Sequence, residues 1–371
     1  MPFFSLPPLP VFNGHIATAF AKNNAVTGDR SGAARFAPCC ERVIDLYETR
    51  KKRWLSFLFS CLLAFSLITP AWAAEGERTL IPLGKAVGIK LFADGALVVS
   101  LEGSDTLKVG DLLLKVNDTR VQSTEQLQAL LQKNGSMPVS MQVRRGERLV
   151  TFTDTPQCGS DGVYRLGAWI RDSMAGIGTV TYYDPATGDF GALGHGITDG
   201  DTMALMPFGS GSILPSTVKA VKKGSSGSAG ELRGNFDLSG DLGPLCANTD
   251  CGIFGTLPAD CTLAAGEALP VGDAVEGPAT IRANVSGDEV REYAVEILKR
   301  LPNASDGREM VISVTDPDLI AATGGIVQGM SGSPILQNGK LVGAVTHVLL
   351  SDATKGYGIS METMLNAGEN V

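Results

Sequence analysis

The sequence predicts a mainly β protein. Of its 371 residues, 44% are hydrophobic and 19% are charged, a composition typical of packed globular domains. Glycine is abundant, with 45 residues, whereas aromatic residues make up only 6% of the chain. Because tight turns use many glycines, this balance favours short strands joined by turns over long helices. The length allows two domains and a leader.

The beginning of the chain differs in charge from the rest. Residues 1–74 hold eight of the 31 Lys and Arg residues and four of the 39 Asp and Glu residues. The remainder, residues 75–371, therefore carries 23 basic and 35 acidic residues, a net charge of −12. An acidic body has no electrostatic reason to bind nucleic acid, so we expect no nucleic-acid partner.

An export signal explains this asymmetry. The basic run Lys51-Lys52-Arg53 precedes an uncharged apolar stretch, residues 54–69, and then the small-residue pattern Ala71-x-Ala73. This order predicts a signal peptide or membrane anchor at 51–74 and export across the cytoplasmic membrane, with the body tethered or released. Residues 1–50 lack clear periodicity and are interpreted either as a disordered leader or as the product of a misassigned start.

Cysteine and histidine usage argues against a metal site. Four cysteines lie beyond the export signal, namely Cys158, Cys246, Cys251 and Cys261. An oxidising compartment would permit three different pairings among them, and buried free thiols are the alternative. No C-x-x-C pair occurs and the chain has three histidines, so we expect neither a metal nor a cofactor.

Residues 78–156 are predicted to form a small separate domain. Apolar strands at 87–91, 96–100, 112–117 and 139–143 surround one helix at 124–133. The phrase KVGDLLLKVND at 108–118, followed by VRRG at 143–146, resembles PDZ domains. That resemblance implies a bound peptide added as an extra strand. The strand expected to receive it is Val87, Gly88, Ile89, Lys90 and Leu91, although these residues depart from the usual G-L-G-F phrase.

Residues 165–371 are predicted to form a second, all-β domain. Strands at 176–183 and 190–193 lead to Gly194-His195-Gly196, so His195 lies at a strand end between two glycines. Further short, glycine-punctuated strands follow at 217–221, 232–236 and 252–257, and a hairpin joins 279–285 to 291–298. This spacing is typical of a barrel or a sandwich.

A possible nucleophile lies near the C-terminus. Residues 329–334, GMSGSP, precede an apolar hairpin that turns at Asn338-Gly339. Small glycines on both sides let a tight turn expose the hydroxyl of Ser331 beside backbone N–H groups. The hexapeptide resembles the nucleophile loop of chymotrypsin-like serine peptidases, and a plain Gly/Ser turn is the alternative.

Few residues could activate Ser331. His195 precedes it by 136 residues, close to the separation of about 140 in the chymotrypsin arrangement. His347 follows on the next strand and is interpreted as a packing residue. The orienting acid is open among Asp184, Asp199 and Asp316. Asp316 precedes a proline and is equally well explained as a helix N-cap.

A closer resemblance covers residues 80–365. The phrases FGALGHGITD, GIFG and VTDPDLIAATGGIVQGMSGSPILQNGKLVGAVTHVLLSDATKGYGI are similar to those of stage IV sporulation protein B peptidases, which belong to the chymotrypsin-like clan. This resemblance implies a PDZ-like domain followed by a double β-barrel serine peptidase domain. It assigns His195 as general base, Asp316 as orienting acid and Ser331 as nucleophile, with the N–H groups of Gly329 and Ser331 as oxyanion hole.

The resemblance also implies a biological setting. Members act in sporulation signalling between the forespore and mother-cell membranes. They cleave a membrane-bound regulator of an intramembrane protease, and also themselves, and so trigger processing of a sigma factor. The alternative is a non-catalytic signalling protein that only binds peptides through its PDZ and peptidase folds. The intact pair His195 and Ser331 favours the enzyme.

Overall fold

The computed structural model describes residues 77–371 except 259, 303 and 305–306. The predicted leader (1–50) and export signal (51–74) lie outside the described residues. In the described part no helix combines the length and apolar character needed to cross a bilayer. The described chain is mainly β, as the sequence predicted. Its helices are α2 (Thr124–Asn134), η1 (Thr262–Ala264), α3 (Pro317–Thr323) and α4 (Met361–Glu369).

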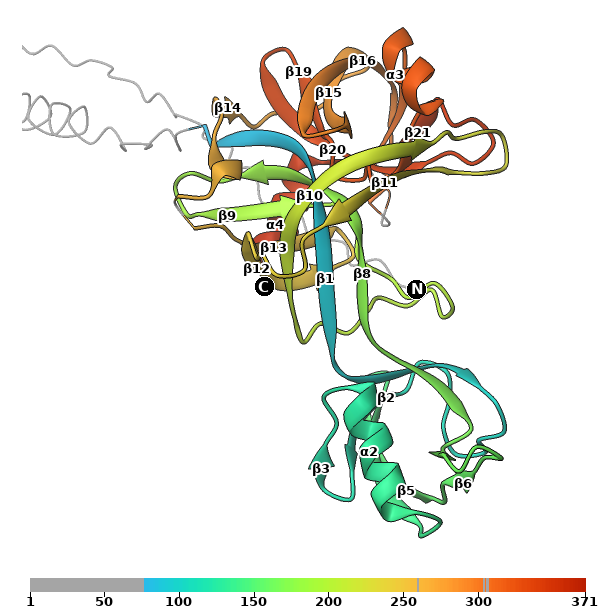
Figure 1. Ribbon diagram of the computed structural model, residues 1–371. Helices are drawn as coiled ribbons and strands as arrows, with labels where there is room; N and C mark the ends of the chain where they lie inside the picture. The colour runs from blue at the N-terminus through green and yellow to red at the C-terminus, as the bar shows by residue number, and fades with distance from the viewer. Residues whose placement is uncertain (1–76, 259, 303, 305–306) are drawn as a thin grey trace, which may run out of the picture. The chain divides into compact units, whose positions relative to one another are not determined.

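Six strands close the first barrel. The strand order β1-β8-β9-β13-β12-β10 returns to β1 because β10 also pairs with β1 (Figure 1). Val180, Phe190, Ile213 and Ile253 lie in its core. The strands are β1 (Thr79–Leu101), β8 (Ala168–Tyr183), β9 (Asp189–Ala192), β10 (Ser210–Lys222), β12 (Gly243–Thr249) and β13 (Gly252–Thr256), and β11 (Gly230–Phe236) and β18 (Val327–Gln328) extend this sheet beyond β10.

A second barrel follows in the chain. Its closed strand order is β15-β16-β17-β21-β20-β19, and its core includes Ile281, Ile297, Ile312 and Ile335. The C-terminal helix α4 packs with the apolar side chains of Met361, Met364 and Leu365. The strands are β15 (Gly277–Ser286), β16 (Glu289–Arg300), β17 (Met310–Val314), β19 (Pro334–Gln337), β20 (Lys340–Val348) and β21 (Lys355–Ser360), and β14 (Leu269–Pro270) pairs with β1.

A PDZ-like module is inserted into the first barrel. The chain leaves the barrel along β1 and returns along β8, and these strands pair from Ile81↔Tyr183 to Leu101↔Ala168 (Figure 1). Leu113, Leu127 and Val143 lie in the module's core. Besides α2 it contains β2 (Leu112–Val116), β3 (Thr119–Arg120), β4 (Val139–Arg145), β5 (Arg148–Asp154), β6 (Gln157–Cys158) and β7 (Tyr164–Arg165).

The insertion changes the predicted boundaries of the two domains. Residues 81–92 were expected in the PDZ-like domain, but they belong to the part of β1 that pairs with β8 and β10 in the barrel. Conversely, Leu166, Ala168 and Ile170 were expected in the peptidase domain from residue 165 on, but they pack in the core of the PDZ-like module. Both strands are long and apolar, so sequence pattern alone could not tell which half belongs to which core.

The predicted peptide-binding strand is wrong. Val87 to Leu91 pair with Pro215 to Gly211 of β10 on one edge and with Gly178 to Met174 of β8 on the other. A peptide can join a sheet only at an edge whose N–H and C=O groups are unpaired. Val87, Gly88, Ile89, Lys90 and Leu91 therefore form an interior barrel strand and cannot receive a peptide.

Candidate active site

The loop that carries Ser331 lies where the two barrels meet. Before the loop, Val327–Gln328 of β18 pairs in parallel with Gly230 and Glu231 of β11. After it, β19 enters the second barrel. Within it, the N–H of Ser333 donates to the carbonyl of Met330 (3.0 Å) and the N–H of Gly332 donates to that of Val345 (2.7 Å). These bonds fix the loop as a tight turn.

Gly332 lets the loop approach the first barrel closely. Its φ angle is +95°, in the region that favours glycine. A Cβ atom at this position would lie 2.1 Å from the carbonyl oxygen of Thr179 and 2.5 Å from the nitrogen of Leu193. Leu193 comes two residues before His195, so this contact brings the serine loop against the segment that carries the histidine.

The hydroxyl of Ser331 is partly exposed but is directed to a backbone group. Its Oγ donates to the carbonyl of Thr346 (2.8 Å), and no hydrogen bond joins it to His195 within the described chain. The backbone N–H of Ser331 has no hydrogen-bond acceptor among the described residues. An N–H group that is to bind an oxyanion must be free in this way. The oxyanion role of Gly329 and Ser331 stays a prediction.

His195 follows β9, and its ring is held by the backbone of the next residue, Gly196. Its Nδ1 lies 2.8 Å from the carbonyl oxygen of Gly196. When Nδ1 carries the proton and donates it to that carbonyl, Nε2 is left as the acceptor, which a general base requires. Burial disfavours the imidazolium ion and lowers the pKa of His195 below its ordinary value. The ring is therefore neutral at pH 7 and able to accept a proton.

Asn248 holds the loop that follows His195. Its Oδ1 accepts from the N–H of Ile197 (2.8 Å), and its Nδ2 donates to the carbonyls of Ile197 (3.0 Å) and Met206 (3.0 Å). Three bonds to one side chain fix the backbone directly after Gly196. The orientation of the histidine thus depends on β12, a strand about fifty residues further along the chain.

His195 and His347 are neighbours. Their ring centroids lie 5.0 Å apart, with a tilt of 38° between the planes. His347 lies on β20 directly after Thr346, the acceptor of the Ser331 hydroxyl. The two barrels therefore bring Ser331, Thr346, His347 and His195 into one site. The predicted nucleophile and base come from different barrels, and each is hydrogen-bonded to a backbone carbonyl rather than to the other.

No hydrogen bond joins Asp316 to His195 among the described residues. Its carboxylate accepts from the N–H groups of Asp318 (2.9 Å), Leu319 (3.1 Å) and Ala294 (3.2 Å), so it caps the N-terminus of α3. Burial alone would raise the pKa of Asp316, but the three N–H donors together lower it below its ordinary value. In this arrangement Asp316 is an N-cap.

The other two acids are also engaged elsewhere. Asp199 is fully buried, forms an ion pair with Arg171 and accepts from the N–H groups of Asp201 and Thr202. Asp184 pairs with Arg78 (3.0 Å) and accepts from the N–H of Ala186 (2.9 Å). Among the described residues, the group bonded to Nδ1 of His195 is the carbonyl of Gly196.

The four cysteines of the described chain are free thiols. Cys158 and Cys246 are exposed, and Cys251 and Cys261 are partly buried. Burial is the largest effect on Cys251 and raises the pKa of its thiol. None of the pairings that the sequence allowed is formed.

Sequence reasoning missed two residues of the site, Thr179 and Asn248. Both are buried and both hold backbone at the site through hydrogen bonds. A threonine in a β-strand and an asparagine near a turn are ordinary residues there, so neither carried a signal. Their partners are 150 and 51 residues away in the sequence.

Two protein families match the chain. The family model SpoIVB peptidase S55 matches residues 162–365, which include His195, Asp316 and Ser331. A PDZ domain model matches residues 106–145. No curated protein matches the chain.

Three solved structures are similar at low identity. The active form of the Rv3671c protease from M. tuberculosis is 14% identical, with 53% of this chain and 74% of that chain covered and a TM-score of 0.29. Its inactive form is 16% identical, with 51% and 81% covered and a TM-score of 0.28. The PDZ domain of an SdrC-like protein from Listeria monocytogenes is 17% identical, with 21% and 87% covered and a TM-score of 0.20.

The family match and the fold agree over the same part of the chain. The S55 model spans more than half of the chain, and the structure places its matched region in the two barrels. The PDZ match falls within the inserted module. This confirms the predicted fold class and family. The chain belongs to the SpoIVB peptidase S55 family and is a serine peptidase with a PDZ domain.

Proposed function

We propose that the chain is a serine endopeptidase in which Ser331 is the nucleophile and His195 the general base. The observation that carries this proposal is the contact between the two barrels at Gly332 and Leu193, which sets the serine loop beside the histidine segment. A serine hydroxyl becomes nucleophilic when a neutral imidazole takes its proton. The lowered pKa of His195 keeps that imidazole neutral at pH 7.

The mechanism begins with a rotation of the serine side chain. Ser331 Oγ leaves the carbonyl of Thr346, to which it donates at rest, and turns toward His195. It then attacks the peptide carbonyl while His195 takes its proton, and the imidazolium returns that proton to the leaving amine. The N–H groups of Gly329 and Ser331 stabilise the negative oxygen of the tetrahedral intermediate.

A backbone carbonyl takes the orienting role in this proposal. The carbonyl of Gly196 holds Nδ1 of His195 at 2.8 Å and selects the tautomer with Nε2 free. Asp316, which the resemblance implies as the acid, is bonded to three backbone N–H groups instead. We therefore assign Asp316 to the helix cap and Gly196 to the histidine.

Alanine variants of two serines in the same loop, Ser331 and Ser333, test whether Ser331 is the nucleophile. The full chain is incubated alone and with an unfolded protein substrate, and fragments are followed by mass spectrometry. Ser331→Ala should abolish both self-cleavage and substrate cleavage. Ser333→Ala is the matched control, because Ser333 is fully buried and its hydroxyl has no hydrogen-bond partner in the described chain. Cleavage by Ser331→Ala at the wild-type rate would contradict the proposal.

We further propose that the enzyme acts in sporulation signalling after export. Its family membership and the predicted export signal at 51–74 support this setting. The protein substrates would be a membrane-bound regulator of an intramembrane protease and the enzyme itself, and cleavage would trigger sigma-factor processing. In the native host, a Ser331→Ala allele should stop sporulation while the protein accumulates uncleaved. Normal sporulation would contradict the role and favour a non-catalytic peptide-binding protein.

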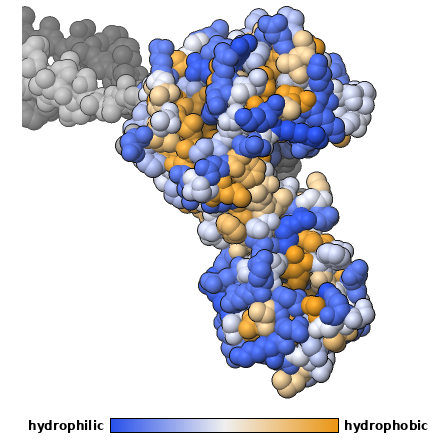
Figure 2. Space-filling view, in the orientation of Figure 1, coloured by the Kyte–Doolittle hydropathy of each residue, from blue (hydrophilic) through white to orange (hydrophobic). Residues whose placement is uncertain are grey.

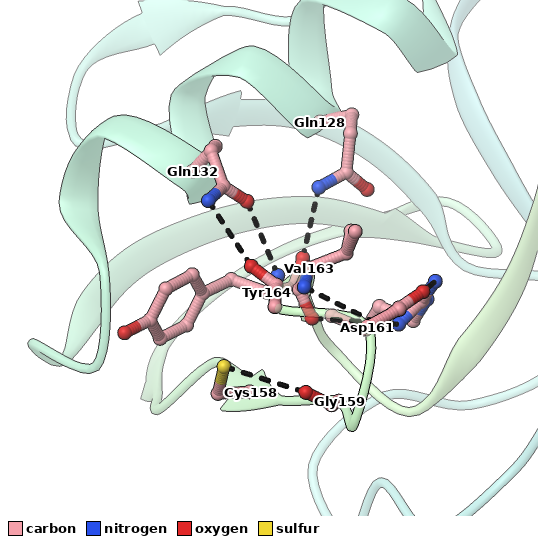
Figure 3. A network of polar contacts seen from close by, with 9 residues as sticks. Gln128, Gln132, Cys158, Gly159, Asp161, Val163 and Tyr164 are labelled. Atoms are coloured by element: carbon pink, nitrogen blue, oxygen red, sulfur yellow. Dashed lines mark hydrogen bonds and ion pairs between the residues drawn. The ribbon is translucent and has the colours of Figure 1, made fainter.

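We propose that a peptide binds the PDZ-like module at β8 instead of at residues 87–91. Its first half, Ala168 to Arg171, pairs with Leu101 to Leu97 of β1, and no strand of the described chain pairs with its other edge. Helix α2 is hydrogen-bonded to the chain before and after this half-strand. From its middle and its last turn, Gln128 donates to the carbonyl of Tyr164 (3.0 Å) and Gln132 accepts from the N–H of Tyr164 (3.3 Å) (Figure 3). Gln132 also donates to the carbonyl of Gly162 (3.2 Å).

The N-terminus of α2 is also joined to this segment. Thr124 donates its N–H (2.7 Å) and its hydroxyl (3.0 Å) to the carboxylate of Asp172. Trp169 lies on β8, between the two segments that are bonded to α2, and its side chain is 60% exposed. Figure 2 shows small apolar patches on the PDZ-like part, surrounded by hydrophilic residues. An unpaired strand edge beside a helix is the arrangement that receives a peptide in PDZ domains.

Hydrogen exchange separates the two possible peptide strands. A hexapeptide with an apolar last residue and a free carboxylate is added to the full chain at saturating concentration. Residues 166–173 should become protected, while 87–91 should not change because both edges are already paired. The same peptide with an amidated C-terminus is the control and should protect less. Protection confined to 87–91 would contradict this assignment.

A further inference from the structure

One buried threonine touches both halves of the proposed active site. Thr179 lies on β8 and is 1% exposed. Its hydroxyl donates to the carbonyl of Gly329 (2.7 Å), and its N–H donates to the carbonyl of Ser331 (3.1 Å). Its own carbonyl accepts from the N–H of Leu193 (3.1 Å). All three polar groups of this residue are therefore used within the site.

These bonds fix the serine loop on both sides of Met330. Gly329 and Ser331 are the two residues whose N–H groups are predicted to bind the oxyanion. Glycine has wide conformational freedom, and the bond to the carbonyl of Gly329 fixes the peptide group between Gly329 and Met330. This limits how Gly329, and with it its N–H, can turn. The hydroxyl of Thr179 supplies that anchor from a rigid barrel strand.

The same residue sets the distance between nucleophile and base. Leu193, which donates to Thr179, precedes His195 by two residues, and Gly332 packs against both Leu193 and Thr179. Thr179 therefore connects the serine loop of the second barrel with the histidine segment of the first. A displacement of about 1 Å between catalytic groups can lower a rate by about 100-fold.

A second threonine on the same strand does not share this role. Thr181 is fully buried two residues further along β8, and its hydroxyl has no hydrogen-bond partner in the described part of the chain. Burial alone therefore does not explain why the hydroxyl of Thr179 meets Gly329. Of these two threonines, Thr179 is the one whose hydroxyl is bonded to the serine loop.

We propose that Thr179 is a positioning residue for the peptidase reaction. It holds the oxyanion-binding backbone of Gly329 and Ser331 in register with His195. The inference rests on the proposed function of Ser331 and His195. Because Thr179 has no free polar group to offer a substrate, its loss changes the chemical step and leaves substrate binding in place.

Three substitutions in the full chain test this role. Thr179→Val keeps the shape and removes the hydroxyl, so kcat for a peptide ester should fall by about 10- to 100-fold while KM stays within about threefold. Thr179→Ser keeps the hydroxyl and should restore kcat to within about threefold of the wild type. Thr181→Val is the matched control and should leave both constants unchanged. A kcat of Thr179→Val equal to that of Thr181→Val would overturn the proposal.

Hydrogen exchange gives a readout that needs no activity. In a Ser331→Ala background, Thr179→Val should speed amide exchange in peptides covering 328–333, whereas Thr181→Val should not. A failure of wild-type turnover would refute the proposed function, and the exchange result would still decide the role of Thr179. Equal exchange in the two double variants, with both still folded by circular dichroism, would refute the positioning role.

Discussion

The two barrels are built from contacts of different range. In the second barrel, hairpins join β15 to β16 and β19 to β20, so most partners are neighbours in the sequence. In the first barrel, β1 pairs with β8 and with β10, which lie on the far side of the inserted module. Local pairing can be predicted from turns and alternation, whereas long-range pairing cannot.

The same difference applies to the two catalytic candidates. Ser331 stands on a loop that leads into a hairpin of the second barrel. His195 depends on Asn248 and, through Leu193, on Thr179, both of which reach it from other strands of the first barrel. The serine can thus be recognised from a local phrase, but the setting of the histidine needs the whole fold.

The largest loss of activity is expected when His195, the catalytic candidate of the first barrel, is removed. His195→Ala should lower kcat at least about 1000-fold, because the serine loses its base. His347→Ala is the matched control from the second barrel and should have a smaller effect. Steady-state kinetics with a peptide ester measure both. A larger loss for His347→Ala would transfer the role of base to the second barrel.

Gly332 tests the contact between the barrels. Gly332→Ala should destabilise the protein by roughly 3 kcal/mol, because a Cβ would meet the carbonyl of Thr179 in a backbone region that strains alanine. Gly339→Ala has the same strain without a neighbour within 4 Å, and should cost about 1 kcal/mol. Urea unfolding measures both values. Equal losses would show that the barrels do not meet closely there.

The pH dependence of activity tests what surrounds His195. Burial lowers its pKa below the ordinary value, so the neutral base should persist as the pH falls below about 6.5. Activity should therefore be full at neutral pH and should fall only as the pH drops through this lowered pKa. A carboxylate at Nδ1 would raise the pKa instead. An acid limb of kcat/KM centred above about 6.5 would contradict orientation by Gly196.

The smallest effect is expected at Asp316. The side-chain oxygen of Asn can still cap α3, but its Nδ2 cannot accept from the N–H of Ala294, so Asp316→Asn should cost less than about 1 kcal/mol in stability and change kcat by less than about threefold. Asp316→Ala removes the cap and should cost about 1 kcal/mol without a larger loss in kcat. A drop of about 100-fold in kcat for Asp316→Asn, at unchanged stability, would restore Asp316 as the orienting acid.

Features of this molecule that depend on local sequence were predictable, whereas those that depend on contacts between distant residues were not. The β class, the PDZ-like module and the Ser331 loop follow from turns, glycines and short phrases. The strand at Val87 to Leu91 was misplaced because its apolar pattern fits an edge strand and an interior strand equally well. Thr179 could not be found, because the two carbonyls to which it donates, those of Gly329 and Ser331, lie about 150 residues away in the sequence.

Modification by a fluorophosphonate tests the central claim most directly. The full chain is treated with the probe, digested, and the modified residue is located by tandem mass spectrometry. We expect one adduct, on Ser331, that is absent from Ser331→Ala, strongly reduced in His195→Ala and retained in Ser333→Ala. An adduct on another serine, or equal labelling of wild type and His195→Ala, would contradict the proposed pair.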